Sequence, residues 1–245
     1  MKKSAILVLA CMLPALSFAQ LDYKWEVVRI DSTFDNGKDY TVTKIIEKYD
    51  SLVAPLQEII GYAEDEYSGR YPESPLSNFA ADALRECAIS LSGGNVDVAL
   101  TNFGGIRSSM PKGAVRVYDI YSIFPFNNDI VWFDVKGSDL RAIFERMVKS
   151  GKMQAWSNVE LVVEGRKISK LNVAGSPLDD SRVYRLATIN FLMEGGDGLA
   201  LSKVAQNQVS SGVYLRDAFV GYIKDKTAKG EKLKLAIDGR VKIIE

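Results

Sequence analysis

The sequence predicts an α+β (α/β mixed) protein, in which helices pack against a mixed β-sheet. Segments with the apolar pattern of strands alternate along the chain with segments of helical spacing. They do not repeat with the regular βαβ period of a doubly wound parallel sheet, and no internal repeat or low-complexity linker interrupts them. About 226 residues follow residue 19, which is enough for one large domain or two small lobes.

The first twenty residues have the three parts of an export signal. Two lysines precede an apolar stretch from Ala5 to Leu16, and SFA, ending at Ala19, places small residues where a signal peptidase reads them. We expect cleavage after Ala19 and a secreted or periplasmic chain. A buried N-terminal helix and lipid attachment at Cys11 are the alternatives; the apolar segment before Cys11 is very short for the second.

Charge and cysteine content narrow the class of protein further. Cleavage leaves 29 basic and 31 acidic residues, a net charge near −2, which does not indicate a general nucleic-acid or membrane-surface binder. Beyond the signal, no run reaches the roughly 20 apolar residues of a transmembrane helix, so we expect none. Cys87 is the one remaining cysteine, which excludes an internal disulfide.

The N-terminal third predicts one strand-like piece and two helices. Residues 23–30, YKWEVVRI, read as a strand before the turn DNGKD. Apolar residues with helical spacing then run from Val42 to Ile59, and Pro55 is expected to break or kink this helix. A second helix at Leu76 to Leu91 has a Ser-Pro start and a Gly-Gly stop.

The rest of the chain reads as strands with two interspersed helices. Gly137 and Gly151 delimit the first of these helices, and Gly165 is expected to form a turn between two strands. The predicted strands are residues 96–100, 115–117, 130–135, 159–163, 168–173, 184–189 and 241–244, and the predicted helices are residues 137–151 and 215–223.

Two loops that follow predicted strands combine glycines with polar residues. TNFGGIR places Gly104 and Gly105 between Asn102 and Arg107, and NFLMEGGDGL places Asp197 among three glycines. Such glycines most often only form a tight turn, and Asp is an ordinary turn residue. As a binding site, however, glycines let backbone N–H groups approach a ligand, and the arginine fork suits phosphate or carboxylate. A carboxylate beside them suits the adjacent hydroxyls of a ribose.

Two phenylalanines stand on loops near the ends of different strands. Phe126 follows a proline in FPFNN, and Phe191 begins the second glycine loop. Each alone reads as a core residue. Together they could form a slot for a flat ring, because stacking on an aromatic side chain tolerates every base. The pair therefore indicates a nucleoside ligand.

The sequence indicates no catalytic residue and no metal site within the chain itself. It contains no histidine, and its Asp and Glu residues lack metal-ligand spacing. Ser108 and Ser109 have no histidine base, and Cys87 lies on the apolar face of a predicted helix. We expect no cofactor in this chain.

Five motifs together resemble one known family. TNFGGIR, IFPFNN, VKGSDLRAIFE, NFLMEGGDGL and DGRVKII occur in the order and approximate spacing of the C-terminal, substrate-specificity domain of secreted 5'-nucleotidases. The resemblance runs from about Asp39 to Glu245, nearly the whole mature chain. It implies that fold, and we divide the chain into a signal peptide (1–19), an N-terminal extension (20–37) and a 5'-nucleotidase C-terminal domain-like part (38–245).

The resemblance also implies a nucleotide or nucleoside site. The matching residues are Phe126 and Phe191 for the base, Asp197 for the ribose hydroxyls, Asn102, Gly104, Gly105 and Arg107 in the first glycine loop, and Arg70 on the phosphate side. For Arg70 an ordinary surface arginine is the alternative. Phe103 stands where relatives often have a glycine or another small residue, which leaves the shape of that loop open.

In full-length members of the family, this domain follows a metallophosphoesterase domain with a two-metal centre. Only about nineteen mature residues precede the matching region here, so the resemblance implies that a separate metallophosphoesterase chain supplies the divalent metals. This chain would then be the substrate-specificity component of a 5'-nucleotidase-type phosphohydrolase. An autonomous periplasmic nucleoside- or nucleotide-binding protein is the main alternative, and hydrolysis by an unrecognised route is a third.

Overall fold

The computed structural model describes residues 24–27 and 40–244. The chain divides into two compact units, residues 1–49 and residues 50–245. The prediction of a strand at 23–30 is wrong for residues 24–27, which have no regular secondary structure. Its other positions and the predicted signal peptide lie outside the described residues.

The helix predicted from residue 42 is α2 (Tyr40–Val53). It gives way to the short 3₁₀ helix η2 (Ala54–Gln57), where Pro55 lacks the N–H that a continuing α-helix requires. The prediction extended this helix to Ile59, which is wrong. Ile59 instead begins β1 (Ile59–Ala63) and pairs with a strand more than fifty residues further along the chain.

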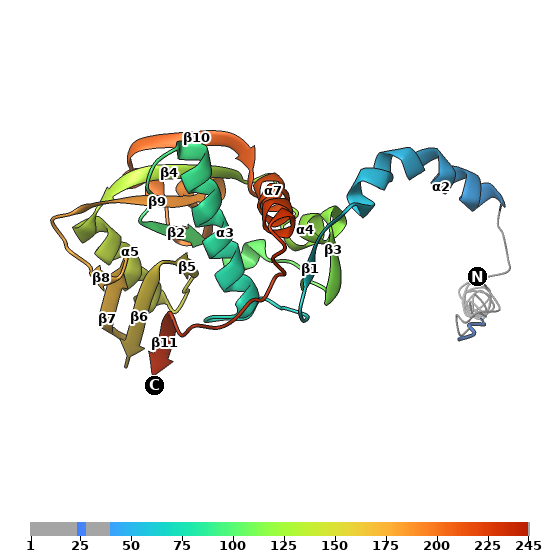
Figure 1. Ribbon diagram of the computed structural model, residues 1–245. Helices are drawn as coiled ribbons and strands as arrows, with labels where there is room; N and C mark the ends of the chain where they lie inside the picture. The colour runs from blue at the N-terminus through green and yellow to red at the C-terminus, as the bar shows by residue number, and fades with distance from the viewer. Residues whose placement is uncertain (1–23, 28–39, 245) are drawn as a thin grey trace, which may run out of the picture. The chain divides into compact units, whose positions relative to one another are not determined.

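A five-stranded mixed sheet lies at the centre of the second unit (Figure 1). The strand order is β10-β4-β9-β2-β5; β2 and β9 run parallel, and the other neighbours run antiparallel. This arrangement confirms the predicted mixed sheet. Its strands are β2 (Val98–Thr101), β4 (Asp129–Lys136), β5 (Ala155–Ser157), β9 (Val183–Ile189) and β10 (Gln206–Tyr214).

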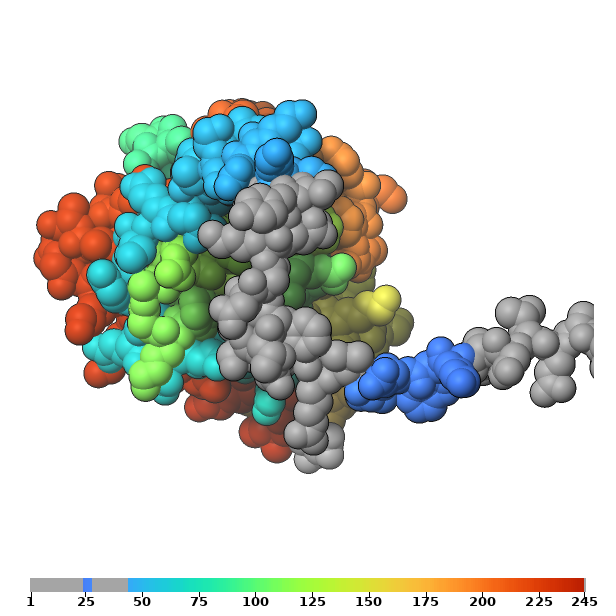
Figure 2. Space-filling model, turned by 90° about the vertical axis from the view of Figure 1, so that its right-hand side faces the viewer, coloured from blue at the N-terminus to red at the C-terminus, as the bar shows by residue number. Residues whose placement is uncertain are grey.

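Two smaller sheets complete the β structure. One has the order β11-β6-β7-β8, and the other pairs β1 with β3; in Figure 2 the cyan surface of β1 lies beside the green surface of β3. The predicted turn between β6 and β7 is confirmed, because Gly165 adopts a φ of 51° there. The strands are β3 (Gly113–Arg116), β6 (Val159–Glu164), β7 (Lys167–Val173), β8 (Ser176–Pro177) and β11 (Val241–Ile244).

The helices cover the sheets, and α3 shows why its predicted limits were right. Ser74 caps the helix, because its side-chain oxygen accepts a hydrogen bond from the backbone N–H of Ser77 at 3.1 Å. Gly93 ends it in the left-handed conformation, at a φ of 63°. The helices of this unit are α3 (Pro75–Ser92), α4 (Val117–Ile123), α5 (Gly137–Ser150), α6 (Asn190–Met193) and α7 (Leu215–Ala228).

The core lies between these helices and the sheets. The ring of Phe144 on α5 stacks on Trp156 of β5 at a centroid distance of 4.2 Å. Close packing also explains the glycine at the start of α5. A Cβ on Gly137 would lie 1.9 Å from the carbonyl oxygen of Asp179, so only glycine fits at this position.

Candidate functional site

The two glycine loops lie at one edge of the central sheet. The first follows β2 and contains the 3₁₀ turn η3 (Phe103–Gly105); the second follows β9 and contains α6 and the 3₁₀ turn η4 (Gly196–Gly198). Because β2 and β9 are parallel neighbours, their carboxyl ends meet at the same edge. The amino end of β4, next to Phe126, reaches this edge too, because Ile130 pairs with Ile189.

A hydrogen-bond network joins the two loops through Asp197. The side-chain amide of Asn102 donates to Oδ2 of Asp197 at 3.1 Å, and the amide of Gln154 donates to the same oxygen at 3.1 Å. Asp197 has a φ of 52°, a left-handed conformation that Asp tolerates better than most residues. The structure therefore brings together two of the predicted site residues, which lie far apart in the sequence.

The carbonyl of the Asn102 side chain is buried and unpaired. Asn102 is 5% exposed, and its Oδ1 accepts no hydrogen bond from the residues that the structure describes. The amide cannot be turned round, because its Oδ1 would then face a carboxylate that is an acceptor only. A Cβ on Gly105 would come within 2.6 Å of this oxygen, so the second glycine of the loop leaves room for Asn102.

Both predicted stacking residues have exposed rings. Phe126 is 44% exposed and Phe191 is 41% exposed, so neither side chain belongs to the core. The guanidinium of Arg107 lies over the Phe126 ring, 5.4 Å from its centroid. The Phe191 ring packs on Gly196, where a Cβ would come within 2.3 Å of the ring. A small hollow beside Phe126 is lined by Thr101, Asn102, Gly105, Phe124, Phe126, Asn128, Ile189 and Leu215.

Arg70 is exposed, and its two neighbours contact the first glycine loop. A Cβ on Gly69 would lie 3.0 Å from the Ile106 side chain. The ring of Tyr71 meets the ring of Phe103 edge to face, with 5.9 Å between centroids. This contact gives the Phe103 ring a packing partner, and it places the segment of Arg70 beside the loop.

The family model described as "5'-nucleotidase, C-terminal domain" matches residues 58–204. The chain belongs to this family. It is 29% identical over 206 residues to the protein UshA of Yersinia enterocolitica, which covers 80% of this chain and 36% of UshA. It is 27% identical over 235 residues to the endonuclease YhcR of Bacillus subtilis, covering 90% of this chain and 18% of YhcR. The chain thus spans about a third or less of these relatives.

Solved structures agree with this assignment. A 5'-nucleotidase precursor from Thermus thermophilus superposes with a TM-score of 0.71 at 26% identity, covering 84% of this chain and 44% of that one. The NAD nucleotidase NadN of Haemophilus influenzae shares the fold, with a TM-score of 0.65 at 19% identity over 92% of this chain and 47% of its own. The fold class and the family resemblance found in the sequence are both confirmed.

Three residues of this 5'-nucleotidase C-terminal domain have contacts at the candidate site that the sequence did not predict. Gln154 joins the two loops, Asn128 lines the hollow, and Arg216 supports the loop of Phe126 by donating a hydrogen bond to the carbonyl of Pro125 at 3.0 Å. The guanidinium of Arg216 also lies 4.7 Å from the Tyr121 ring centroid. Asn128 ends the motif IFPFNN but was given no role there, and no motif marks Gln154 or Arg216, because their roles depend on contacts between distant segments.

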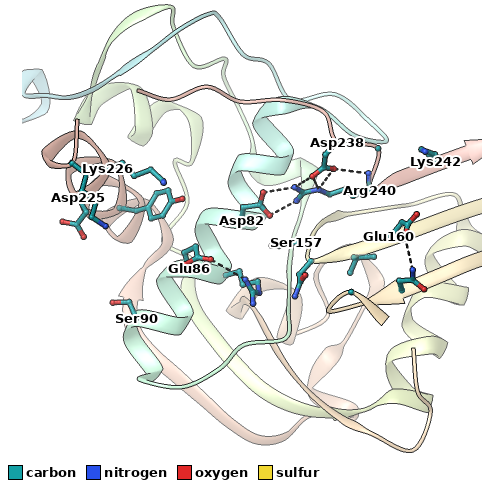
Figure 3. Close-up of a pocket in the computed structure, with 18 residues that line it drawn as sticks. Asp82, Glu86, Ser90, Ser157, Glu160, Asp225, Lys226, Asp238, Arg240 and Lys242 are labelled. Atoms are coloured by element: carbon teal, nitrogen blue, oxygen red, sulfur yellow. Dashed lines mark hydrogen bonds and ion pairs between the residues drawn. The ribbon is translucent and has the colours of Figure 1, made fainter. Parts of the chain in front are cut away.

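A larger hollow lies elsewhere and is built around an ion-pair cluster (Figure 3). It has a volume of about 980 Å³ and lies among α3, α7, β6 and the segment before β11. The guanidinium of Arg240 donates to both oxygens of Asp82, at 2.7 and 2.8 Å, and to Asp238 at 2.6 Å. It also donates to the carbonyl of Trp156 at 3.0 Å. Because its donors are satisfied by the protein, we interpret Arg240 as a structural cross-link.

Two further observations concern metal binding and nucleophilic chemistry in the described residues. That part contains no group of three or more His, Cys, Asp or Glu side chains arranged to hold a metal ion. Burial raises the pKa of the Cys87 thiol to about 12, with smaller contributions from the charges of Glu86 and Asp225. A thiol of this pKa is not an activated nucleophile at neutral pH. No described helix has the length and apolar character of a membrane span.

Proposed function

We propose that the chain is the substrate-specificity component of a 5'-nucleotidase-type phosphohydrolase that acts in nucleotide catabolism. The supporting observation is the joining of the two glycine loops by the Asn102–Asp197 hydrogen bond, with an exposed phenylalanine beside each loop. In this proposal the base stacks between Phe126 and Phe191. The names of the related proteins support the substrate class, since the Thermus relative is a 5'-nucleotidase precursor.

Each polar residue then has a task set by its chemistry. Ionised Asp197 accepts hydrogen bonds from the ribose hydroxyls, and charged acceptors of this kind form the stronger hydrogen bonds. Asn102 offers its unpaired Oδ1 to a donor of the ligand. Arg107 and Arg70 face the phosphate side, where their charge favours a nucleotide over a nucleoside. This division makes the chain a binding and positioning element.

The hydrolytic step is assigned to a separate metallophosphoesterase chain that holds the divalent metals. This chain would present the phosphate ester to that centre, and water would cleave the bond between phosphorus and the ester oxygen there. The helix α2 is a candidate docking element for the partner, because its apolar side chains are exposed in the described residues. They are Ile45, Ile46, Tyr49, Leu52 and Val53.

Titration calorimetry with the purified chain tests the proposal. We expect AMP and adenosine to bind and AMP to release no phosphate when Mn²⁺ or Zn²⁺ is added. A secreted metallophosphoesterase from the same organism, lacking its own C-terminal domain, should form a complex with the chain and gain activity. Binding without such a gain indicates an autonomous binding protein. Phosphate release by the chain alone contradicts the assignment of catalysis to a partner, and failure to bind either ligand removes the nucleotide function.

The ribose assignment predicts a discrimination between two nucleosides. Asp197→Asn keeps the shape of the side chain but removes its charge. We expect adenosine affinity to fall about 10-fold and 2'-deoxyadenosine affinity about 3-fold, because the deoxynucleoside has one hydroxyl fewer that could donate to Asp197. Calorimetry on both ligands measures the difference. Asp65→Asn, a change at an exposed surface residue, is the control. Equal losses for the two nucleosides would remove Asp197 from ribose recognition.

A further inference from the structure

Gln154 occupies a place in the sheet that puts its side chain between the two glycine loops. It immediately precedes β5, which pairs antiparallel with β2 so that Ala155 lies opposite Thr101. Gln154 therefore reaches the sheet edge beside the first loop. Its side chain is in the interior, with 5% of the residue exposed. A buried amide of this kind must find partners for both ends, and the loops supply them.

The two ends of the Gln154 amide bind different loops. Its Oε1 accepts a hydrogen bond from the backbone N–H of Phe103 at 3.2 Å, and its Nε2 donates to Oδ2 of Asp197 at 3.1 Å. The amide orientation is determined by these partners, since an N–H can only donate and an ionised carboxylate can only accept. Gln154 thus connects the backbone of the first loop to the side chain of the second.

The network uses only one oxygen of Asp197. Oδ2 accepts both amide donors, from Asn102 and Gln154, while Oδ1 accepts none from the residues that the structure describes. Asp197 itself is exposed and lies in the glycine-rich turn, where Gly195 and Gly198 also have positive φ, of 108° and 79°. A turn of this composition does not hold a side chain in one rotamer by itself. The two buried amides anchor one oxygen and leave the other without a donor among the described residues.

We propose that Gln154 is a positioning residue for nucleoside recognition. This inference rests on the proposed function, because the ligand group in question is the pair of ribose hydroxyls. By anchoring Oδ2, Gln154 holds Oδ1 of Asp197 in the orientation that accepts from the hydroxyls. The rotational freedom of the carboxylate is then lost on folding and not on binding. Gln154 raises affinity for a ribose without contacting the ligand.

Gln154→Met tests this role, because methionine has a similar length and makes neither hydrogen bond. We expect adenosine affinity to fall about 3- to 10-fold, the cost of immobilising one side chain on binding. Affinity for 2',3'-dideoxyadenosine, which lacks both hydroxyls, should not change. Gln208→Met on β10 is the matched control, since Gln208 is exposed and makes no side-chain hydrogen bond among the described residues. A purely structural role for Gln154 predicts equal losses for the two ligands and overturns the proposal.

A double-mutant cycle that combines Gln154→Met with Asp197→Ala distinguishes failure of the positioning role from failure of the proposed function. We expect adenosine to bind the double variant as weakly as it binds Asp197→Ala alone, because Gln154 acts only through Asp197. Additive losses overturn the positioning role while leaving the proposed function intact. If the parent chain binds no nucleoside, the proposed function fails. The same cycle, measured as urea midpoints without ligand, then decides whether the Gln154–Asp197 anchor exists: independent effects contradict it, and coupled effects support it.

Discussion

Replacement of Arg240 by methionine is expected to lower the free energy of unfolding by about 3 kcal/mol. The Arg240 side chain is only 12% exposed, and it links Asp82 on α3 to Asp238 in the segment before β11. Breaking a buried ion pair costs about 3–5 kcal/mol when a charge is left unpaired. The Asp82 and Asp238 side chains are 43% and 54% exposed, so water can reach them in the variant, which favours the lower end of that range.

Urea unfolding at pH 7 measures this loss, with Arg141→Met as a matched control. Arg141 also pairs with an aspartate, Asp180, at 2.7 Å, but this pair is more exposed, at 35% and 57% of the two side chains. Exposed pairs contribute about 0–1 kcal/mol, so the control should change little. Equal losses in the two variants would show that the Arg240 cluster does not hold the C-terminal segment.

The same cluster has a pH dependence that the variant should lack. Burial disfavours the charged form of Arg240, but hydrogen bonds to Asp238 and Asp82 outweigh it and raise the pKa of the guanidinium. The hydrogen bond from Arg240 lowers the pKa of Asp238. Asp238 therefore stabilises the fold above its unfolded pKa of about 3.9, and this stabilisation is lost as the pH falls through the lowered folded pKa. The stability difference between parent and variant should shrink below about pH 4.

Helix limits were predictable where one residue type decides them. The Ser-Pro start and glycine stop of α3, and the glycines at the two ends of α5, act through local backbone geometry, so they can be recognised without knowledge of the fold. The strand 130–135 was predictable for a similar reason. As β4, it lies between β10 and β9 and buries Ile130, Val131, Phe133 and Val135, apolar residues of the kind that strands favour.

The missed elements owe their structure to distant partners. The edge strand β10 reads QNQVSSGVY, whose residues are mostly exposed and alternate in no clear pattern; it is a strand because it pairs with β4. The predicted strand at 115–117 is displaced to Gly113–Arg116. Val117 instead begins α4, where Asp119 accepts a hydrogen bond from the backbone N–H of Arg116 at 2.7 Å. Propensity alone does not reveal that cap.

The candidate site divides in the same way. Gly105 and Asp197 were predictable as candidate site residues because glycine loops after strands can be recognised in the sequence. The parallel pairing of β2 with β9 brings these two loops together. No sequence motif indicates Gln154, because its role depends on the register between β5 and β2.

Loss of either exposed phenylalanine ring is expected to weaken nucleoside binding. Stacking of a base on an aromatic side chain contributes about 1–3 kcal/mol, so Phe126→Ala and Phe191→Ala should each reduce adenosine affinity about 5- to 150-fold. The fold should tolerate both changes, because 44% of Phe126 and 41% of Phe191 are already exposed. We expect the free energy of unfolding to change by less than about 1 kcal/mol in each variant.

The two rings differ in their surroundings, and this difference sharpens the test. One face of Phe126 carries the Arg107 guanidinium, so in the proposed function a base would stack on the opposite face. Phe191 packs on Gly196, so its orientation is determined by the turn that also holds Asp197. Calorimetry with adenosine, guanosine and cytidine should therefore show losses for all three bases, since every base offers a π face.

Tyr62→Ala supplies the control for these variants, because Tyr62 is an exposed aromatic residue of β1 at 49% exposure. Its removal should leave nucleoside affinity unchanged. If Phe126→Ala and Phe191→Ala also bind adenosine as the parent does, the rings do not hold a base, and nucleotide recognition must be assigned to other residues. If only one of the two variants loses affinity, the base stacks on that ring alone, and the other ring does not contribute to the stacking energy.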